Sequence, residues 1–336
     1  MSEQPGADTT RSRWHPRDLV RLRGRDIAGR SHRRLRRALA LGCLIAAAAM
    51  PAGSSVAGWP VTRSPAAGPP VSGSPASGSP TAGPPVADIP APTILRMLQM
   101  NLCNSGRAGC YTGRSVARAA EVINAERPDL VTLNEICQDD VPALRRVFAE
   151  VHTDGTVVSA FQAAGDRPSG ADTRCRNGKS YGIGLLTRLS APDTRHTVHS
   201  GIHPTQDVAD PEERAWLCVH VDSTLHACTT HLAATSRTVA LAQCGHLLDG
   251  ILPAIRRSTG YAPTVLAGDL NLRAGDPDVR ACAPPGYLRV DDGALQHVLA
   301  STDITFRRTR TVLMDGATDH AALLTTLTID GSRASR

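Results

Sequence analysis

Polar side chains that can bind a metal ion or move a proton follow apolar runs at five places in this sequence. The five segments are Gln99-Met100-Asn101, Asn134-Glu135, Thr230-His231, Gly268-Asp269-Leu270-Asn271 and Thr318-Asp319-His320. Burying ionisable groups costs free energy unless they are paired or bound to a metal. Polar groups that repeatedly end apolar runs therefore predict one shared site at the edge of a sheet.

Each segment taken alone also has a purely structural interpretation. Asn101 can simply end a strand, and Glu135 can cap a helix that begins near Asp139. A single histidine such as His231 is more often a hydrogen-bonded core residue, and the last two segments can be a turn and a surface pair. The five segments in this order are much harder to explain in that way.

The residue types fit the cleavage of a phosphoester. Carboxylate and amide oxygens are the ligands that Mg²⁺ prefers, with Mn²⁺ or Ca²⁺ as alternatives. A metal ion and hydrogen-bond donors together stabilise the negative charge that develops at phosphorus. Water can then be the nucleophile, so that no covalent serine or cysteine is required.

The elements that must position these groups are mostly strands. Apolar runs predict strands over 94–101, 129–135, 157–162, 181–188, 263–269, 295–300 and 321–329, and a hairpin of 214–221 with 224–231. Helical spacing of apolar residues predicts helices over 115–126, 141–151 and 235–257, and the polar stretch 163–180 is predicted to be a loop. This order indicates an α+β fold in which sheets pack in layers.

The ordered set MN…NE…YGIGLLTR…TTHL…AGDLN…TDHAAL resembles the endonuclease/exonuclease/phosphatase superfamily, over essentially all of residues 94–330. The resemblance implies a four-layer α/β sandwich of the DNase I-like type, with two packed mixed β-sheets flanked by helices. It also implies a metal-dependent phosphoester hydrolase of the nuclease type. A lipid or inositol phosphate hydrolase and a non-catalytic binding module on the same fold stay open as alternatives.

The resemblance assigns a role to each polar position. Glu135 resembles the Mg²⁺ carboxylate, with Asn101 and Asp319 beside the metal. Asp269 resembles the residue that aligns or deprotonates the attacking water. The remaining positions would contact the phosphoryl group, Asn271 through a hydrogen bond and His231 and His320 as donors to the developing charge.

One position departs from the family pattern. Gln296 stands in the late strand where the family has an aspartate that orients the catalytic histidine. A glutamine carbonyl can accept a hydrogen bond from the imidazole of His320, but it leaves that histidine less basic than a carboxylate would. We also expect three basic residues of the loop before residue 181 to contact phosphate, namely Arg174, Arg176 and Lys179.

The residues before the catalytic domain are typical of an exported protein. Residues 1–57 contain eleven arginines within the first 37 positions, a short apolar run and a small-residue stretch, which indicates a signal peptide or an uncleaved membrane anchor. Residues 58–93 are rich in Pro, Gly, Ser and Ala and are predicted to be a disordered linker. We therefore expect a catalytic domain over 94–330 that is secreted, or tethered at the outer face of the membrane.

Eight cysteines follow Cys43, and an even number after an export signal predicts disulfides. Cys218 and Cys228 lie on the two arms of the predicted hairpin and are expected to pair. Cys103 and Cys137 each follow a metal-site position by two residues and are expected to pair if their strands are neighbours.

The substrate is left open by the sequence. A phosphoester is expected and a nucleic acid is one candidate, although residues 94–336 carry 25 basic and 26 acidic residues and so have no overall positive charge. Trp216 is the only tryptophan of this region and is predicted to be buried in a strand, which disfavours a lipid substrate. We predict no protein partner and expect a monomer.

Overall fold

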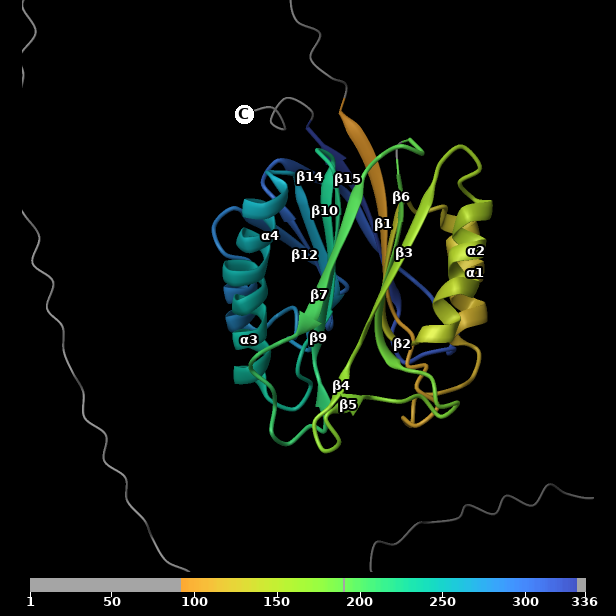
Figure 1. The fold of residues 1–336 in the computed structure, drawn as a ribbon, viewed down its shortest axis with the longest axis vertical. Helices are drawn as coiled ribbons and strands as arrows, with labels where there is room; N and C mark the ends of the chain where they lie inside the picture. Colours follow the sequence, from red (N-terminus) through yellow and green to blue (C-terminus); the bar gives the residue numbers. More distant parts are fainter. Residues whose placement is uncertain (1–91, 190, 331–336) are drawn as a thin grey trace, which may run out of the picture. The chain divides into compact units, whose positions relative to one another are not determined.

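The computed structural model describes residues 92–189 and 191–330. The predicted signal or anchor over 1–57, and all but the last two residues of the predicted linker over 58–93, lie outside the described residues. Two six-stranded sheets pack face to face, and helices cover the outer face of each sheet (Figure 1). This is the predicted DNase I-like α/β sandwich.

The first sheet has the order β14-β15-β1-β2-β6-β3. Its strands are β1 (Thr93–Asn101), β2 (Leu130–Cys137), β3 (Val157–Ala163), β6 (Tyr181–Arg188), β14 (Ile304–Val312) and β15 (Ala322–Ile329). Strands β1 and β2 run parallel, so Asn101 lies opposite Asn134 where both strands end. The helices on this side are α1 (Ser115–Glu126) and α2 (Val141–Glu150), the second preceded by the 3-10 turn η1 (Gln138–Asp140).

The second sheet has the order β12-β13-β11-β10-β9-β7. Its strands are β7 (His196–Ile202), β9 (Ala215–Val221), β10 (Leu225–His231), β11 (Thr264–Asp269), β12 (Tyr287–Asp291) and β13 (Gln296–Ser301). Strands β10 and β11 run parallel and place His231 opposite Asp269 at their shared end. Four site residues, Asn101, Glu135, His231 and Asp269, therefore come from the carboxyl ends of parallel strand pairs.

One continuous helical stretch covers the second sheet. It comprises α3 (Arg237–Gly245), the π-helical turn η2 (His246–Ile251) and α4 (Leu252–Thr259), with the 3-10 helix η3 (Pro277–Cys282) beside α3. The stretch is long and apolar enough to cross a membrane by composition. Its apolar side chains, among them Leu247, Leu252 and Ile255, instead pack against buried residues of the second sheet.

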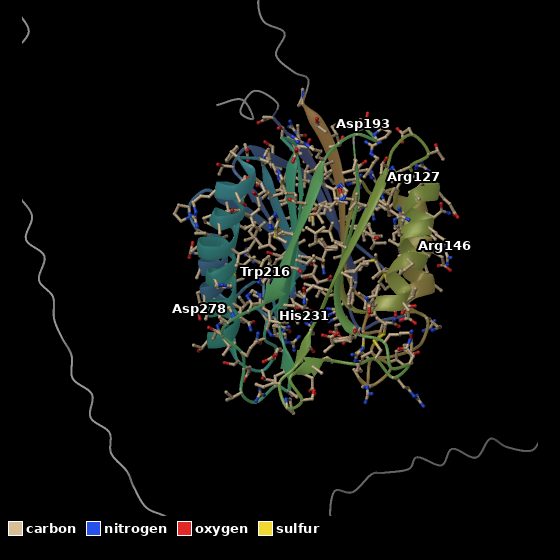
Figure 2. All side chains as sticks on the ribbon, in the orientation of Figure 1. Arg127, Arg146, Asp193, Trp216, His231 and Asp278 are labelled. Carbon is tan, nitrogen blue, oxygen red and sulfur yellow. A yellow bond between two sulfur atoms is a disulfide. The ribbon has the colours of Figure 1, made fainter. Side chains whose placement is uncertain are left out.

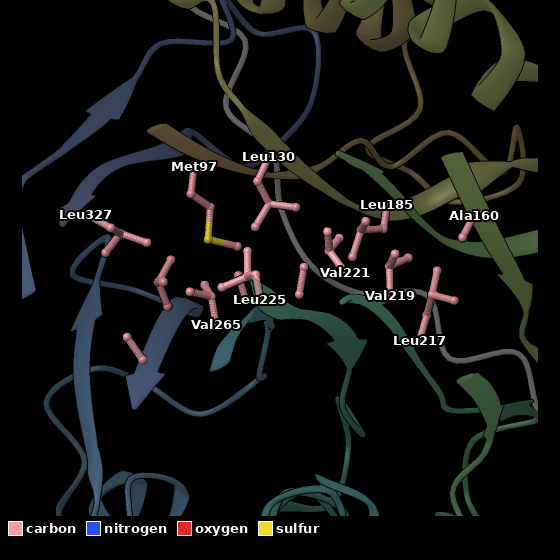
Figure 3. Close-up of a cluster of buried hydrophobic side chains, with 14 of the residues drawn as sticks. Met97, Leu130, Ala160, Leu185, Leu217, Val219, Val221, Leu225, Val265 and Leu327 are labelled. Atoms are coloured by element: carbon pink, nitrogen blue, oxygen red, sulfur yellow. The ribbon is translucent and has the colours of Figure 1, made fainter. Parts of the chain in front are cut away.

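Side chains alternate between the two faces of each strand, so the core is divided into layers. In β1, Leu98 and Met100 point outward and pack with residues of α1 and α2. Met97 points inward, into the cluster between the two sheets that Figure 3 shows. The next two inward positions of the same strand are Gln99 and Asn101, so the space between the sheets becomes polar toward the end of β1.

Several strands are absent from the prediction. The structure adds β7, β12 and β14, and within the predicted loop 163–180 it adds β4 (Gly165–Asp166) and β5 (Ala171–Asp172), which form a small sheet with β8 (Glu212–Glu213). The three longer strands all lie at sheet edges. An edge strand exposes much of its surface, so it lacks the apolar run on which the prediction depended.

Four disulfides join the eight cysteines of the described residues. Cys218–Cys228 is confirmed, because β9 and β10 are antiparallel and place these two residues directly opposite each other. The predicted Cys103–Cys137 pair is wrong, although β1 and β2 are neighbours. The chain turns away at Cys103, which has a left-handed φ of 43°. The other bonds are Cys103–Cys110, Cys137–Cys175 and Cys244–Cys282.

Candidate active site

Five of the predicted catalytic and metal-binding residues line one cavity at the end of the sandwich. The cavity has a volume of about 470 Å³, and its lining includes Glu135, His231, Asp269, Asn271 and His320. In Figure 2, His231 lies toward the end at which Figure 1 places β4 and β5, whereas Asp193 lies at the opposite end. The structure therefore brings side chains from four of the five segments together at one cavity.

Local backbone geometry turns two of these side chains into the cavity. Glu135 has a left-handed φ of 56°, at a shift in the pairing register of β2 with β6 between Leu133 and Ile136. Such a bulge reorients a side chain that would otherwise follow the strand alternation. Asn271 has a φ of 51° in the turn that follows β11. Left-handed backbone is unfavourable for a glutamate, is tolerated by an asparagine, and is often found at functional sites.

The amide of Asn101 connects the two central carboxylates. Its Nδ2 donates to Glu135 Oε1 at 2.8 Å and to Asp269 Oδ2 at 3.0 Å. The other oxygen of Asp269, Oδ1, accepts from the backbone N–H of Asn271 at 2.9 Å. Burial, followed by the neighbouring negative charge of Asp269, raises the pKa of Glu135, and burial also raises the pKa of Asp269. Two acidic groups are thus held together where a cation would lower their energy.

His320 lies beside Asp269. Its Nε2 is 3.6 Å from Asp269 Oδ2 and 3.8 Å from Asp319 Oδ1. The Asp319 side chain is 55% exposed. A carboxylate oxygen of Asp319 also lies within 4.8 Å of the sulfur atoms of Cys103 and Cys110. Asp269, rather than a residue of the late strand, is therefore the buried carboxylate nearest to the imidazole of His320.

Gln296 does not make the predicted hydrogen bond to His320. Its Nε2 donates to the backbone carbonyl of Ala321, and its Oε1 accepts from Gln99 Nε2 at 3.3 Å. The residue occupies the predicted strand, but it supports the segment after His320 through the backbone. A direct role in orienting the imidazole is therefore replaced by a role in a buried amide network.

That network lies directly beneath the candidate catalytic side chains. Asn134 Oδ1 accepts from Gln99 Nε2 at 2.8 Å and from the backbone N–H of Asp269 at 2.7 Å, and its Nδ2 donates to the Thr230 carbonyl at 3.1 Å. Asn134 thereby connects the first sheet to two strands of the second. The sequence contained Asn134 next to Glu135 but gave no indication of this bridging role.

Arg214 is a site residue that the sequence prediction missed. One Nη atom lies 2.9 Å from Nδ1 and 3.2 Å from Nε2 of His231, and 3.2 Å from Glu212 Oε1. The second Nη atom lies 2.7 Å from Asp210 Oδ2. Burial opposes the charge of Arg214, but the two carboxylates outweigh it and raise the pKa of the guanidinium. The site thus contains a permanently positive group.

The same cluster changes the expected state of His231. Burial, followed by the positive charge of Arg214, lowers the pKa of His231 well below its usual value. His231 is therefore a neutral imidazole at neutral pH, and its Nε2 lies 3.8 Å from Glu135 Oε1. Burial raises the pKa of Glu212 to about 7, although Arg214 opposes that shift.

The sequence does contain one signal for Arg214, because it is a charged residue directly before the buried strand β9.

The three residues predicted to contact phosphate lie in different places in the structure. Arg174 lines the catalytic cavity, together with Arg107 from the loop after β1. Arg176 lines a second cavity beside it. Lys179 is exposed and belongs to the lining of neither cavity.

Comparison with solved structures supports the fold. A protein of this family from Beutenbergia cavernae is 21% identical, with a TM-score of 0.51 over 70% of this chain and 72% of that one. ANGEL2, described as a 2',3'-cyclic phosphatase, is 13% identical, with a TM-score of 0.52 over 71% of this chain and 96% of that one. The human Nocturnin catalytic domain is 14% identical, with a TM-score of 0.51 over 72% of this chain and 99% of that one.

A search of curated proteins finds no match. The family model described as "Endonuclease/Exonuclease/phosphatase family" matches residues 98–320, a range that contains every polar segment described above. The chain therefore belongs to the endonuclease/exonuclease/phosphatase family, a superfamily of phosphoesterases.

Proposed function

We propose that this protein is a Mg²⁺-dependent hydrolase in which water attacks the phosphorus of a phosphodiester. The observation that carries the proposal is the amide of Asn101, which holds the carboxylates of Glu135 and Asp269 together in one cavity. The histidines His231 and His320 line the same cavity and supply donors around that pair. Carboxylates with raised pKa values beside hydrogen-bond donors are typical of catalytic sites.

The donor set fits a hard divalent cation. Glu135 would hold the ion, with a carboxylate oxygen of Asp319 as a further candidate ligand. The Asn101 oxygen accepts from the backbone N–H of Cys103 at 3.1 Å, so Asn101 would bind the ion only with its amide reversed. Mg²⁺ bound there supplies positive charge that offsets the charge of the substrate phosphate. Mn²⁺ and Ca²⁺ prefer the same oxygen donors and are alternatives.

The residues of the chain then have distinct roles. Asp269 accepts the proton of the attacking water, because hydrogen bonds from Asn101 and from the backbone of Asn271 fix its carboxylate. His320 lies 3.6 Å from Asp269 and donates to a phosphoryl oxygen. Neutral His231 donates a hydrogen bond from its N–H to the negative charge that develops on the phosphoryl group. Arg214 beside it supplies positive charge over the whole working pH range.

The first experiment measures hydrolysis of bis(p-nitrophenyl) phosphate by the full chain before and after EDTA. We expect EDTA to abolish turnover and added Mg²⁺ or Mn²⁺ to restore it. Glu135→Gln should weaken Mn²⁺ binding, followed by electron paramagnetic resonance, by about 10- to 100-fold. The matched control is Glu121→Gln, because Glu121 lies exposed on α1. Turnover that survives EDTA would contradict the metal assignment. Metal binding without any turnover would instead favour a binding module.

The four disulfides are typical of proteins from oxidising compartments. Together with the basic and apolar segments of residues 1–57, they support the proposal that the catalytic domain works outside the cytoplasm. Fractionation of cells, followed by mass spectrometry of the unreduced protein, tests it. Eight free thiols in the catalytic domain would contradict export.

A further inference from the structure

A second cavity lies beside the catalytic one and contains none of the reacting groups. Its volume is about 350 Å³, and it shares Ser105 with the lining of the catalytic cavity. Two loops supply most of its lining: the first loop, residues 103–110, follows β1, and the second loop, residues 173–180, precedes β6. The two cavities are therefore successive spaces along the same pair of loops.

The two loops form one wall that is already in place. The Cys103–Cys110 bond closes the first loop, and Cys137–Cys175 ties the second loop to the end of β2. The backbone N–H of Arg176 donates to the Ser105 carbonyl at 2.8 Å. Arg107 Nε donates to the Arg174 carbonyl at 3.0 Å. A binding surface that is already fixed loses little entropy when it takes a ligand.

The wall carries four cations that have no acidic partner among the described residues. They are Arg107, Arg174, Arg176 and Lys179. Arg188 and Arg237 each contact two aspartates, whereas the exposed Arg146 also lacks an acidic partner among the described residues. What distinguishes the cations of the wall is that three of them line two adjoining cavities. Arg107 and Arg174 line the catalytic cavity, whereas Arg176 lines the second one. Unpaired positive charge thus extends from the reacting groups into the second cavity.

The second cavity also contains an exposed aromatic ring. Tyr111 is 40% exposed and lines the cavity together with Arg176. The guanidinium of Arg176 makes no hydrogen bond or ion pair within the part of the chain that the structure describes. The carboxylate of the lining, Asp140, accepts a 2.6 Å hydrogen bond from Asn104. An open ring and a free guanidinium are the side chains on which unstacked nucleobases rest.

We propose that the second cavity binds the nucleotide next to the scissile bond, so that the substrate is a single-stranded nucleic acid. The base rests on Tyr111 and Arg176, and the neighbouring phosphate contacts Arg107 and Arg174. A duplex is disfavoured because its bases are stacked inside the helix and cannot enter a cavity. This inference rests on the proposed function for the position of the scissile phosphate.

The test measures binding of a fluorescent eight-nucleotide single strand by anisotropy. EDTA is present so that the strand is not cleaved during the measurement. Tyr111→Ala should raise Kd by about 5- to 150-fold, since one base stack is lost. Arg176→Gln should raise Kd and reduce the slope of log Kd against log salt by about 0.7. The matched control is Arg146→Gln, an exposed arginine on α2 for which neither change is expected.

Three results would overturn the proposal. Unchanged Kd and salt slope in Tyr111→Ala and Arg176→Gln would remove the subsite. If a strand that lacks bases binds as tightly as the normal strand, the wall binds only the phosphate anions. Tighter binding of a duplex than of the single strand would exclude the base contact.

Hydrolysis separates this inference from the proposed function. In both variants the KM for the single strand should rise relative to the KM for bis(p-nitrophenyl) phosphate. Absence of turnover on both substrates, with the anisotropy results as expected, would contradict the proposed function and leave the subsite supported.

Discussion

The space between the two sheets has two ends of opposite character. At one end, inward side chains such as Met97, Leu130, Val265 and Leu327 form an apolar cluster (Figure 3). At the other end the inward positions are amides, hydroxyls and carboxylates, which hydrogen-bond across the sheets. Strand β1 contains both, since its inward face runs from Met97 to Asn101.

The difference indicates that stability and the proposed catalysis depend on different segments of the same strands. Burial of apolar surface at the first end contributes free energy of folding without fixing an exact geometry. At the second end, each buried polar atom needs its partner, so the hydrogen bonds of Asn134 and Gln99 define one arrangement. Substitutions at the two ends should therefore have opposite consequences.

The largest effect is expected at the polar end. Asp269→Ala and His320→Ala should each reduce turnover by about 10²- to 10⁴-fold, because each removes a group that acts on the reacting atoms. Circular dichroism and thermal unfolding should show a folded protein in both cases. Turnover close to wild type in either variant would remove that residue from the mechanism.

At the apolar end we expect a large loss of stability without a loss of activity. Leu327→Ala should lower the free energy of unfolding by about 2–5 kcal/mol, since Leu327 is fully buried and leaves a cavity. The activity per folded molecule should stay unchanged, because Leu327 pairs with Leu95 at the start of β1, far from Asn101. Urea unfolding and kcat measured on the same preparation give the two values. A fall in kcat without loss of stability would show that the ends are not separate.

An intermediate variant should affect both properties. Asn134→Ala removes the acceptor of the Asp269 backbone N–H and leaves that group buried without its partner. We expect a loss of about 1–3 kcal/mol in the free energy of unfolding, together with reduced turnover. Asn134→Asp is the informative control, because it keeps an acceptor but loses the donor to Thr230. Stability equal to wild type in the alanine variant would show that the network contributes nothing.

The last prediction concerns pH, and its effect disappears at neutral pH. Burial, followed by the neighbouring His246, lowers the pKa of His203 to about 3, below the value near 6.5 of an unfolded chain. The unfolded state therefore binds this proton more readily, so the contribution of His203 to stability is present above pH 6.5. It is lost as the pH falls from 6.5 toward 3. Urea midpoints should show a weaker fall over that range in His203→Gln than in the wild type, and parallel curves would contradict this.

Strands that are buried were predicted from the sequence, and strands at the exposed sheet edges were mostly missed. Central strands such as β2 and β11 are almost entirely buried, and their apolar runs identified them within one or two residues. The edge strand β14 contains three arginines within Ile304–Val312 and has only one buried residue, so no periodic signal marked it. The fold class needed only the central strands, which is why it was predicted correctly.

The site was predictable to the extent that it consists of short polar segments at strand ends. The family resemblance supplied Glu135, Asp269 and His320, and the structure brings these into one cavity. Arg214 could not be found in this way, because its effect depends on a contact with His231 that only the folded chain creates. The partners of Gln296 were missed for the same reason, since they lie on β1 and after His320.

The disulfides of the domain have a consequence for how the chain is made. Each cysteine pairs with the next cysteine along the sequence: 103 with 110, 137 with 175, 218 with 228 and 244 with 282. Eight cysteines allow 105 connectivities. A chain that crosses a membrane with its N-terminus first would release these cysteines in pairing order. Oxidation in order of emergence would then yield the native set without any reshuffling by an isomerase.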